Sequence, residues 1–395
     1  MGIGILDGIR VLDFTWVLAG PYATRILADF GAEVIKVQSK KTARGVESNL
    51  AGYFMYWNRN KRSITLDMKY PESKELVLRL VRISDVVVEN FSPRVMENWG
   101  LGYERLKEVK PDLIMLSLSA FGQSGPWKNF VAFGPTLQAL SGLSYLTSYS
   151  KEFPVGIGYA YSDIISGLYG ALSILVALEF RDRTGKGQYI DLSQYEALCT
   201  VIGPTFLDLF VNHREIGPQG NRSQEIAASP YGCYRCRGED RWCVIAVFNE
   251  EEWEKLCRIM GEPPWTKEPR FSTLSNRKEN EEELDRLIER WTTNYPPEQI
   301  VDMLQKEGIS AGVVQDARDL VEDPHLKARE FFIQLEHPLF GKTLGEASPI
   351  RFKGDSKLDW KAAPLLGQDN HYVFTKLIGL TEEQYSSFVE KGIIG

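Results

Sequence analysis

This sequence of 395 residues has no long apolar segment and no excess of positive charge. No apolar run reaches the length of about 18 residues that a membrane-spanning helix needs, and the best candidate, residues 164–178, is shorter and broken by glycines. The formal net charge of −7 argues against a nucleic-acid-binding protein. The sequence therefore predicts a protein that binds neither a membrane nor nucleic acid.

Cysteine is also sparse. Five cysteines in a chain of this length indicate reduced thiols and a cytoplasmic protein, and the N-terminus has no signal-peptide pattern. Cys233 and Cys236 have the spacing of a zinc or redox pair, but no second pair or suitably spaced histidines follow. We therefore expect no metal site and no tightly bound cofactor.

A third absence concerns the first predicted β-α-β unit. Residues 9–14 and 33–37 have the apolar character of strands, and residues 22–30 between them favour a helix ending at Gly31. No Gly-x-Gly-x-x-Gly motif lies between the first strand and its helix, which argues against an NAD-dependent dehydrogenase. Any ligand is still expected at the carboxyl ends of the strands.

The same alternation continues to about residue 211 and predicts an α/β fold with a helix-covered parallel sheet. Further strands are expected at residues 85–89, 113–117 and 188–193, with helices at 73–83 and 194–211. Residues 212–228 are polar and glycine-bearing, as in a linker. Residues 229–330 combine a strand at 242–247 with acidic helices and predict a smaller α+β domain.

The segment with the most chemical content is a predicted helix from Asp163 to about Arg181. A carboxylate at a helix start is usually a cap, because it accepts backbone N–H groups and suits the positive end of the helix dipole. The alternative is a nucleophile that attacks an activated acyl group, beside Gly167 and Gly170. The helix alone leaves both interpretations open.

Short motifs along nearly the whole chain, in order, carry a resemblance to a known family. They lie at residues 12–15, 19–21, 27–36, 58–63, 89–91, 100–103, 121–126, 185–188 and 323–325. With them, the sequence resembles the family III CoA-transferases, a group that also contains 2-methylacyl-CoA racemases and the carnitine and formyl-CoA transferases. Each motif is weak alone, and together they are specific.

The resemblance implies a role for Asp163, which matches the family's nucleophile in its Asp-x-x-x-Gly context with Gly167. It also implies a large Rossmann-like domain built from residues 1–211 and the returning tail 331–395, with the small domain inserted between them. Two such chains would interlock as a homodimer, or as a heterodimer with a related chain. The substrates would be an acyl-CoA and a carboxylic acid.

Coenzyme A needs cations for its phosphates and an apolar slot for its adenine. The residues that the resemblance points to are Val17, Ala19, Lys61, Arg62, Asn90, Phe91 and Arg94. Lys61 and Arg62 could equally belong to a solvated charged loop, and Phe91 to the core. Some transferases carry arginines where this chain has Ser39 and Asn98, so the resemblance leaves the detailed phosphate contacts open, with a contribution from a partner subunit as an alternative.

Aromatic residues suggest the acyl pocket. Phe133, Tyr159 and Tyr161 are the candidates, and they favour a bulky or aromatic acyl group with succinyl-CoA as donor. Such aromatic side chains more often belong to a core.

Two alternatives to a transferase remain. A 2-methylacyl-CoA racemase needs a second acid–base group, but Phe133 stands where the racemases have a histidine. A non-catalytic CoA-binding subunit of a heteromeric transferase would not need Asp163.

Overall fold

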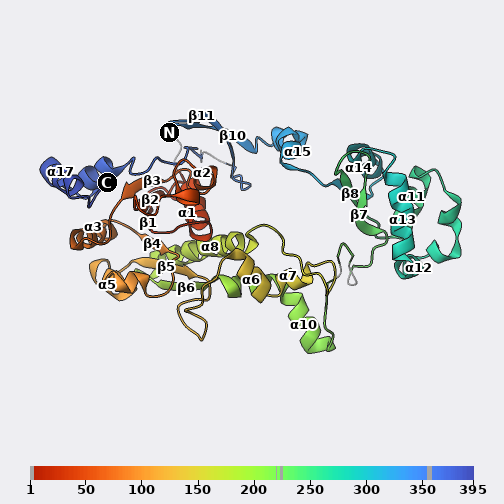
Figure 1. The fold of residues 1–395 in the computed structure, drawn as a ribbon, viewed down its shortest axis with the longest axis horizontal. Coiled ribbons are helices and arrows are strands. Elements are labelled where there is room, and N and C mark those ends of the chain that lie inside the picture. Colours follow the sequence, from red (N-terminus) through yellow and green to blue (C-terminus); the bar gives the residue numbers. More distant parts are fainter. Residues whose placement is uncertain (1–3, 219, 223–225, 354–357) are drawn as a thin grey trace. The chain divides into compact units, whose positions relative to one another are not determined.

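The computed structural model describes residues 4–218, 220–222, 226–353 and 358–395 (Figure 1). Contacts group the chain into two compact units. Unit 1 comprises Met1–Ser144, Gly156–Ile216 and Glu330–Gly395, and unit 2 comprises Tyr145–Val155 and Gly217–Arg329. The domain boundaries expected from the sequence, at residues 211, 228 and 330, stay a prediction.

Unit 1 is built on a six-stranded sheet in which each strand is parallel to its neighbours, as predicted for an α/β fold. The strand order is β3-β2-β1-β4-β5-β6. The strands are β1 Arg10–Asp13, β2 Glu33–Gln38, β3 Arg62–Thr65, β4 Val86–Glu89, β5 Ile114–Ser119 and β6 Tyr189–Ser193. Strand β3 was not predicted, because Ile64 is the single apolar residue among its four and gives no strand periodicity.

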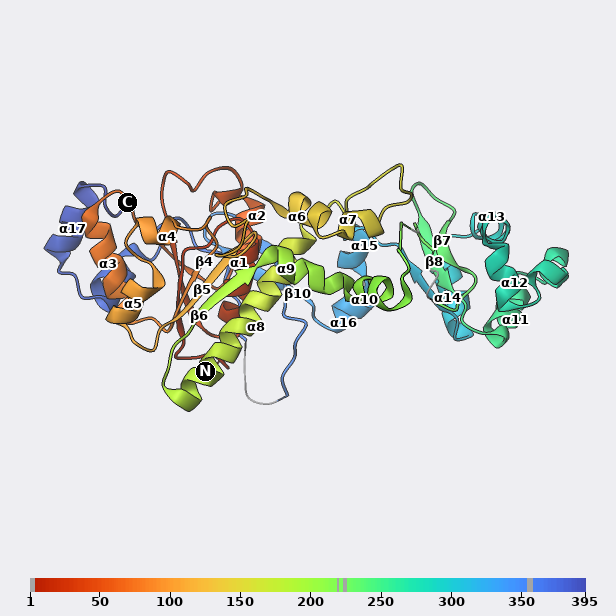
Figure 2. The ribbon, with the colours of Figure 1, turned by 90° about the horizontal axis from the view of Figure 1, so that it is seen from below.

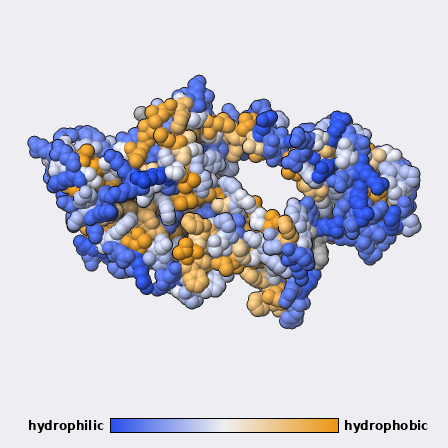
Figure 3. All heavy atoms as spheres, in the orientation of Figure 1, coloured by the Kyte–Doolittle hydropathy of each residue, from blue (hydrophilic) through white to orange (hydrophobic). Residues whose placement is uncertain are grey.

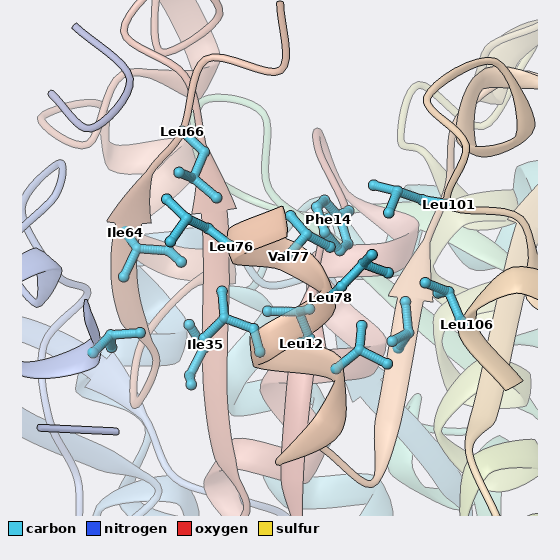
Figure 4. Close-up of a cluster of buried hydrophobic side chains, with 14 of the residues drawn as sticks. Leu12, Phe14, Ile35, Ile64, Leu66, Leu76, Val77, Leu78, Leu101 and Leu106 are labelled. Carbon is cyan, nitrogen blue, oxygen red and sulfur yellow. The ribbon is translucent and has the colours of Figure 1, made fainter. Parts of the chain in front are cut away.

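Helices cover both faces of this sheet, since successive side chains of a strand point to opposite sides. On one face Leu12, Ile35 and Ile64 meet Leu76 and Val77 of α3, which spans Pro71–Arg82 (Figure 4). On the other face the sheet packs against α1, Ala19–Asp29, and α8, Tyr161–Thr184. Figure 2 shows α8 running beside β6.

The remaining helices of unit 1 are short. They are α2 Gly52–Trp57, α4 Val95–Asn98, α5 Tyr103–Val109, α6 Gly134–Leu140, α9 Gln194–Cys199, α10 Gly203–Asn212 and α17 Glu382–Glu390, with α7 Leu143–Leu146 at the boundary between the units. The prediction of one helix over residues 194–211 was wrong, because a 3₁₀ turn at Thr200–Ile202 separates α9 from α10. Pro204 cannot donate a backbone hydrogen bond and lies in the first turn of α10, which begins at Gly203.

The C-terminal segment returns to unit 1 through charged contacts. It contains the hairpin of β10, Phe332–His337, and β11, Gly341–Glu346. Arg25 and Arg59 both reach Glu346, and Arg59 also pairs with Asp29 of α1 at 2.6 Å. Buried ion pairs of this kind need every partner in place, so they fix how the tail docks.

Unit 2 contains an antiparallel sheet of β7 Tyr231–Arg235, β8 Trp242–Ala246 and β9 Ser310–Val313. Its helices are α11 Glu250–Ile259, α12 Leu274–Glu279, α13 Glu281–Thr292, α14 Pro297–Lys306, α15 Ala317–Glu322 and α16 Pro324–Ala328. Cys243, Ile245, Leu256 and Ile288 lie in its core. Cys233 and Cys236 are free thiols.

Helix α8 is long and apolar enough, by length and composition alone, to cross a membrane. The core helix of a soluble protein passes the same test. The buried stripe of α8, which includes Ser166, Gly170, Ile174 and Ala177, packs in unit 1 against α1 and the sheet.

Candidate active site

Asp163 lies in the first turn of α8, which begins two residues earlier than predicted and has no side-chain cap at Ala160. Two glycines bring this helix against α1. A Cβ atom on Gly167 would stand 2.8 Å from a Tyr22 ring atom and 2.9 Å from the Ala19 carbonyl oxygen, and one on Gly170 would crowd the Ala23 side chain. Only glycine therefore permits the approach that brings Asp163 beside the start of α1.

The Asp163 carboxyl group is surrounded by backbone and small side chains. A Cβ atom on Gly134, the first residue of α6, would stand 2.9 Å from Asp163 Oδ2. The Ser162 hydroxyl lies 3.4 Å from the same oxygen, and the Ala19 backbone N–H donates toward the carboxylate. No lysine or arginine of the described residues forms an ion pair with it, so its charge is balanced by dipoles alone.

Burial raises the pKa of Asp163 to about 6, and the hydrogen bonds from Ser162 and the backbone N–H groups of Asp163 and Ala19 offset only part of this rise. At pH 7 the group is mostly ionised, yet more basic than an exposed aspartate. A carboxylate with these properties is suited to attack an electrophile.

Tyr53 of α2 is a neighbour that the sequence did not reveal. Burial first, and then the negative charge of Asp163, raise the pKa of Tyr53 to about 12. The phenol stays protonated near neutral pH and is able to donate a hydrogen bond in this site. In the sequence it is one aromatic residue among several in residues 53–57, with no signal to distinguish it.

The loop between β1 and α1 is anchored by Asp13 at the end of β1. Asp13 Oδ1 accepts hydrogen bonds from the Thr15 backbone N–H at 2.8 Å and from its hydroxyl at 2.5 Å. Oδ2 accepts from Thr24 Oγ1 at 2.7 Å and from Lys61 Nζ at 3.0 Å. Burial alone would raise the pKa of Asp13, but Lys61, Lys36 and the two hydroxyls lower it to about 2.

Lys61 does not occupy the position predicted for it. Its side chain is fully buried, and Nζ donates to Asp13 Oδ2, to the Pro21 carbonyl oxygen at 3.0 Å and to Asn58 Oδ1 at 2.9 Å. An ammonium group has three N–H donors, so none is left for a phosphate. The predicted phosphate contact of Lys61 is therefore wrong, and its role is to bind the β1–α1 loop.

The predicted phosphate contact of Arg62 is also wrong. It is the first residue of β3 and pairs with Glu33, the first residue of β2, at 2.8 Å and with Asp369 at 3.0 Å. The Arg62 guanidinium thus shares Glu33 with Arg10, the first residue of β1, whereas the loop that leads to Ala19 leaves β1 at its other end. Arg62 cannot share a phosphate site with Ala19 and instead ties the C-terminal tail to the sheet.

Asn90, which follows β4, holds the β1–α1 loop. Its Oδ1 accepts from the Trp16 backbone N–H at 2.8 Å, and its Nδ2 donates to the Trp16 carbonyl oxygen at 2.9 Å. Arg94, four residues later, precedes α4 with a left-handed φ of 74°. Asn90 therefore holds the β1–α1 loop in place through Trp16. Val17 lies within this loop, and Ala19 directly follows it as the first residue of α1.

A pocket of 340 Å³ lies at the carboxyl ends of β1 to β4. Phe91, already predicted, lines it, with Trp99 packed edge-on to the Phe91 ring at 5.3 Å. Lys41 and Lys69 lie on the same wall, and Lys41 pairs with Asp67 at 2.6 Å. Further lining comes from Phe14, Trp16, Lys36, Val37, Ser39, Glu47, Leu66 and Met68. Parallel α/β sheets bind ligands at this edge.

The three aromatic candidates have different surroundings. Phe133 is 61% exposed and directly precedes Gly134, which contacts Asp163, while Tyr159 is 58% exposed. Tyr161 is partly buried and packs against a cluster that includes Phe121 and Leu137. Phe133 and Tyr159 are thus exposed residues that lie near Asp163 or its contacts in the sequence, whereas Tyr161 packs partly into the core. Their role in an acyl pocket stays a prediction.

The sequence and the structure of this chain are similar to those of known proteins. The sequence model of CoA-transferase family III matches residues 6–370. The chain is 35% identical to the succinyl-CoA–D-citramalate CoA-transferase of Chloroflexus aurantiacus, over 98% of both chains. It is 31% identical to the formyl-CoA:oxalate CoA-transferase of Rhodopseudomonas palustris, over 98% of this chain and 96% of the relative. A CAIB/BAIF family protein from Brucella suis superposes with a TM-score of 0.87 at 32% identity, over 95% of this chain and 100% of that one.

Proposed function

Because the chain belongs to CoA-transferase family III, and is an enzyme of that family, we propose that it transfers coenzyme A through covalent intermediates on Asp163. The observation that carries the proposal is the Asp163 carboxylate, which pairs with no lysine or arginine among the described residues and lies in the first turn of α8, beside the start of α1. A structural cap would be expected to have a pKa below its ordinary value, whereas burial raises this one.

The reaction has four steps. An oxygen of Asp163 attacks the carbonyl carbon of the donor thioester, the C–S bond breaks, and an acyl-aspartyl anhydride and a CoA thiolate result. The thiolate attacks the aspartyl carbonyl carbon, which releases the donor acid and leaves an aspartyl-CoA thioester. The acceptor carboxylate attacks the aspartyl carbonyl carbon of that thioester, the C–S bond breaks, and a second anhydride and a CoA thiolate result. The thiolate then attacks the acceptor's acyl carbon and regenerates Asp163.

Groups around Asp163 supply what these steps need. The backbone N–H of Ala19 and the Tyr53 hydroxyl are suited to stabilise the negative charge that develops on the carbonyl oxygen. The N-cap position of α1 is Leu18, which has no side chain to satisfy the first N–H groups of that helix. Among those first residues of α1, Ala19 donates its N–H toward the reacting carboxyl group.

The 340 Å³ pocket is proposed to hold the nucleotide part of coenzyme A. Phe91, Trp99 and Met68 offer an apolar slot for the adenine ring, and Lys41 and Lys69 offer positive charge for phosphates. These lysines would serve in place of the arginines that some relatives carry at the positions of Ser39 and Asn98. Succinyl-CoA is the proposed donor, which the name of the C. aurantiacus relative supports.

A dimer is part of the proposal. The outer face of α8 exposes Leu168, Leu172 and Val176, which are spaced four residues apart and are 45%, 55% and 60% exposed. On α10, Leu207 and Phe210 are 65% and 77% exposed, and Figure 3 shows apolar side chains gathered there. Apolar faces of this extent favour association with a second chain. Sedimentation velocity would test this, and a monomer at micromolar concentration would contradict it.

The decisive experiment is intact mass spectrometry after mixing the protein with succinyl-CoA. The wild type is expected to gain a CoA-sized adduct that hydroxylamine removes, and Asp163→Ala is expected to gain none. An incubation with one thioester and a panel of acids then separates exchange from α-epimerisation. No adduct and no exchange with a broad thioester panel would favour the non-catalytic subunit.

A further inference from the structure

The β1–α1 loop contains a residue in an unfavourable backbone conformation. Val17 has a φ of 61°, in the left-handed region that β-branched residues rarely adopt. Such a conformation persists only where the surroundings hold it, and it concentrates at functional sites. Two residues later, the Ala19 N–H points at Asp163.

One side chain from a distant segment holds this conformation. Glu47 Oε1 accepts the Val17 backbone N–H at 2.7 Å, across 30 residues of sequence. A hydrogen bond from a backbone N–H to a carboxylate is stronger than one between neutral groups. Glu47 is the last residue of the short helix Gly45–Glu47 and is partly buried.

The same segment forms one wall of the 340 Å³ pocket. Ser39, Lys41, Thr42, Ala43 and Glu47 all line it. Glu47 therefore connects the wall of the proposed nucleotide pocket with the loop that leads to Ala19, whose N–H donates toward Asp163. Asn90 and Asp13 hold Trp16 and Thr15 from the sheet side, whereas Glu47 holds Val17 from the segment after β2.

We infer that Glu47 is a positioning residue of the proposed transferase: by fixing Val17 in its left-handed conformation, it directs the Ala19 N–H at Asp163. The inference rests on the proposed function, because it concerns the same carboxylate. It assigns Glu47 no contact with the reacting atoms. Without Glu47, Val17 relaxes toward a negative φ, the first N–H groups of α1 turn, and Asp163 loses a donor.

The test compares Glu47→Ala and Glu47→Gln with the wild type. Glu47→Ala is expected to lower kcat by about 10- to 100-fold, since one oxyanion-type donor is displaced. The acid limb of its kcat/KM profile is expected to move to higher pH, because Asp163 loses a hydrogen bond that lowers its pKa. Glu47→Gln keeps an oxygen acceptor and is expected to recover most of kcat and the wild-type acid limb.

Glu252→Ala is the matched control. Glu252 accepts the Phe248 backbone N–H at 2.8 Å in unit 2, the same type of contact away from Asp163. It is expected to leave kcat and the pH profile unchanged. A Glu252 variant as impaired as Glu47→Ala would show that the loss is a general effect of removing such a contact, and would overturn the inference.

Amide hydrogen exchange provides a readout independent of activity. The Val17 amide is expected to exchange faster in Glu47→Ala than in the wild type, and at near wild-type rate in Glu47→Gln. Unchanged exchange at Val17, or unchanged kcat and acid limb in Glu47→Ala, would overturn the inference. A wild type without transfer would instead overturn the proposed function, and the exchange rates would still decide whether Glu47 holds the loop.

Discussion

Asp13 and Asp163 are aspartates of unit 1, the first fully and the second partly buried, and their pKa values are shifted in opposite directions. Asp13 accepts four hydrogen bonds, one of them from the buried ammonium of Lys61, and its pKa falls to about 2. Asp163 pairs with no cation in the part of the chain that the structure describes and has few donors, and its pKa rises to about 6. A carboxylate whose lone pairs are all bound is a structural tie, whereas one that is left partly unsatisfied is available to react.

The largest effect is expected from removing the proposed nucleophile. Asp163→Asn keeps the shape of the side chain but cannot form an anhydride, so CoA transfer is expected to fall by about 10⁴-fold or more. Steady-state transfer assays with succinyl-CoA would measure this. Transfer within tenfold of the wild type would place Asp163 with Asp13 as a structural group.

Replacing Asp13, the structural aspartate, is expected to lower the stability of the fold. Asp13→Asn leaves the Lys61 ammonium buried without its counter-charge, which is expected to cost about 3–5 kcal/mol in the free energy of unfolding. Urea unfolding monitored by circular dichroism would measure the loss. The double variant Asp13→Asn, Lys61→Met is expected to recover part of it, and a double variant as unstable as the single one would contradict the ion-pair explanation.

The pH dependence of catalysis sharpens the contrast. Because Asp163 reacts only when ionised, kcat/KM is expected to fall about tenfold per pH unit below pH 6. Glu89 is a possible second source of a pH effect, since burial raises its pKa to about 7. Glu89→Gln is the control, and it is expected to keep the limb near pH 6. A limb that moves with Glu89 would assign the titration to that residue.

The smallest expected effect is the change in the stability of the protein when Asp163 is replaced. A folded-state pKa raised above the unfolded value means that the protonated form stabilises the fold at low pH, and that this contribution is lost as pH rises through about 6. Asp163→Asn is therefore expected to be about 1–2 kcal/mol more stable than the wild type at pH 8. Thermal unfolding would show a smaller difference at pH 5, whereas a constant difference would contradict a titration origin.

The sequence by itself determined the α/β class and most of the sheet. Apolar runs predicted five of the six strands of unit 1, because strands buried on both faces are continuously apolar. The helix that begins at Tyr161 was predicted to within a few residues, with Asp163 in its first turn. The family motifs predicted CoA-transferase chemistry, which the family match and the named relatives support.

The tertiary structure decided which charged residues surround the site. Lys61 and Arg62 are adjacent in the sequence, yet one is buried against Asp13 and the other lies at the opposite edge of the sheet. Lys61 directly precedes β3 and Arg62 is its first residue, and their partners, Asp13 for one and Glu33 and Asp369 for the other, set their burial. Tyr53 and Glu47 reach the site only because residues 45–57 fold back onto the loop after β1, a contact with no local pattern in the sequence.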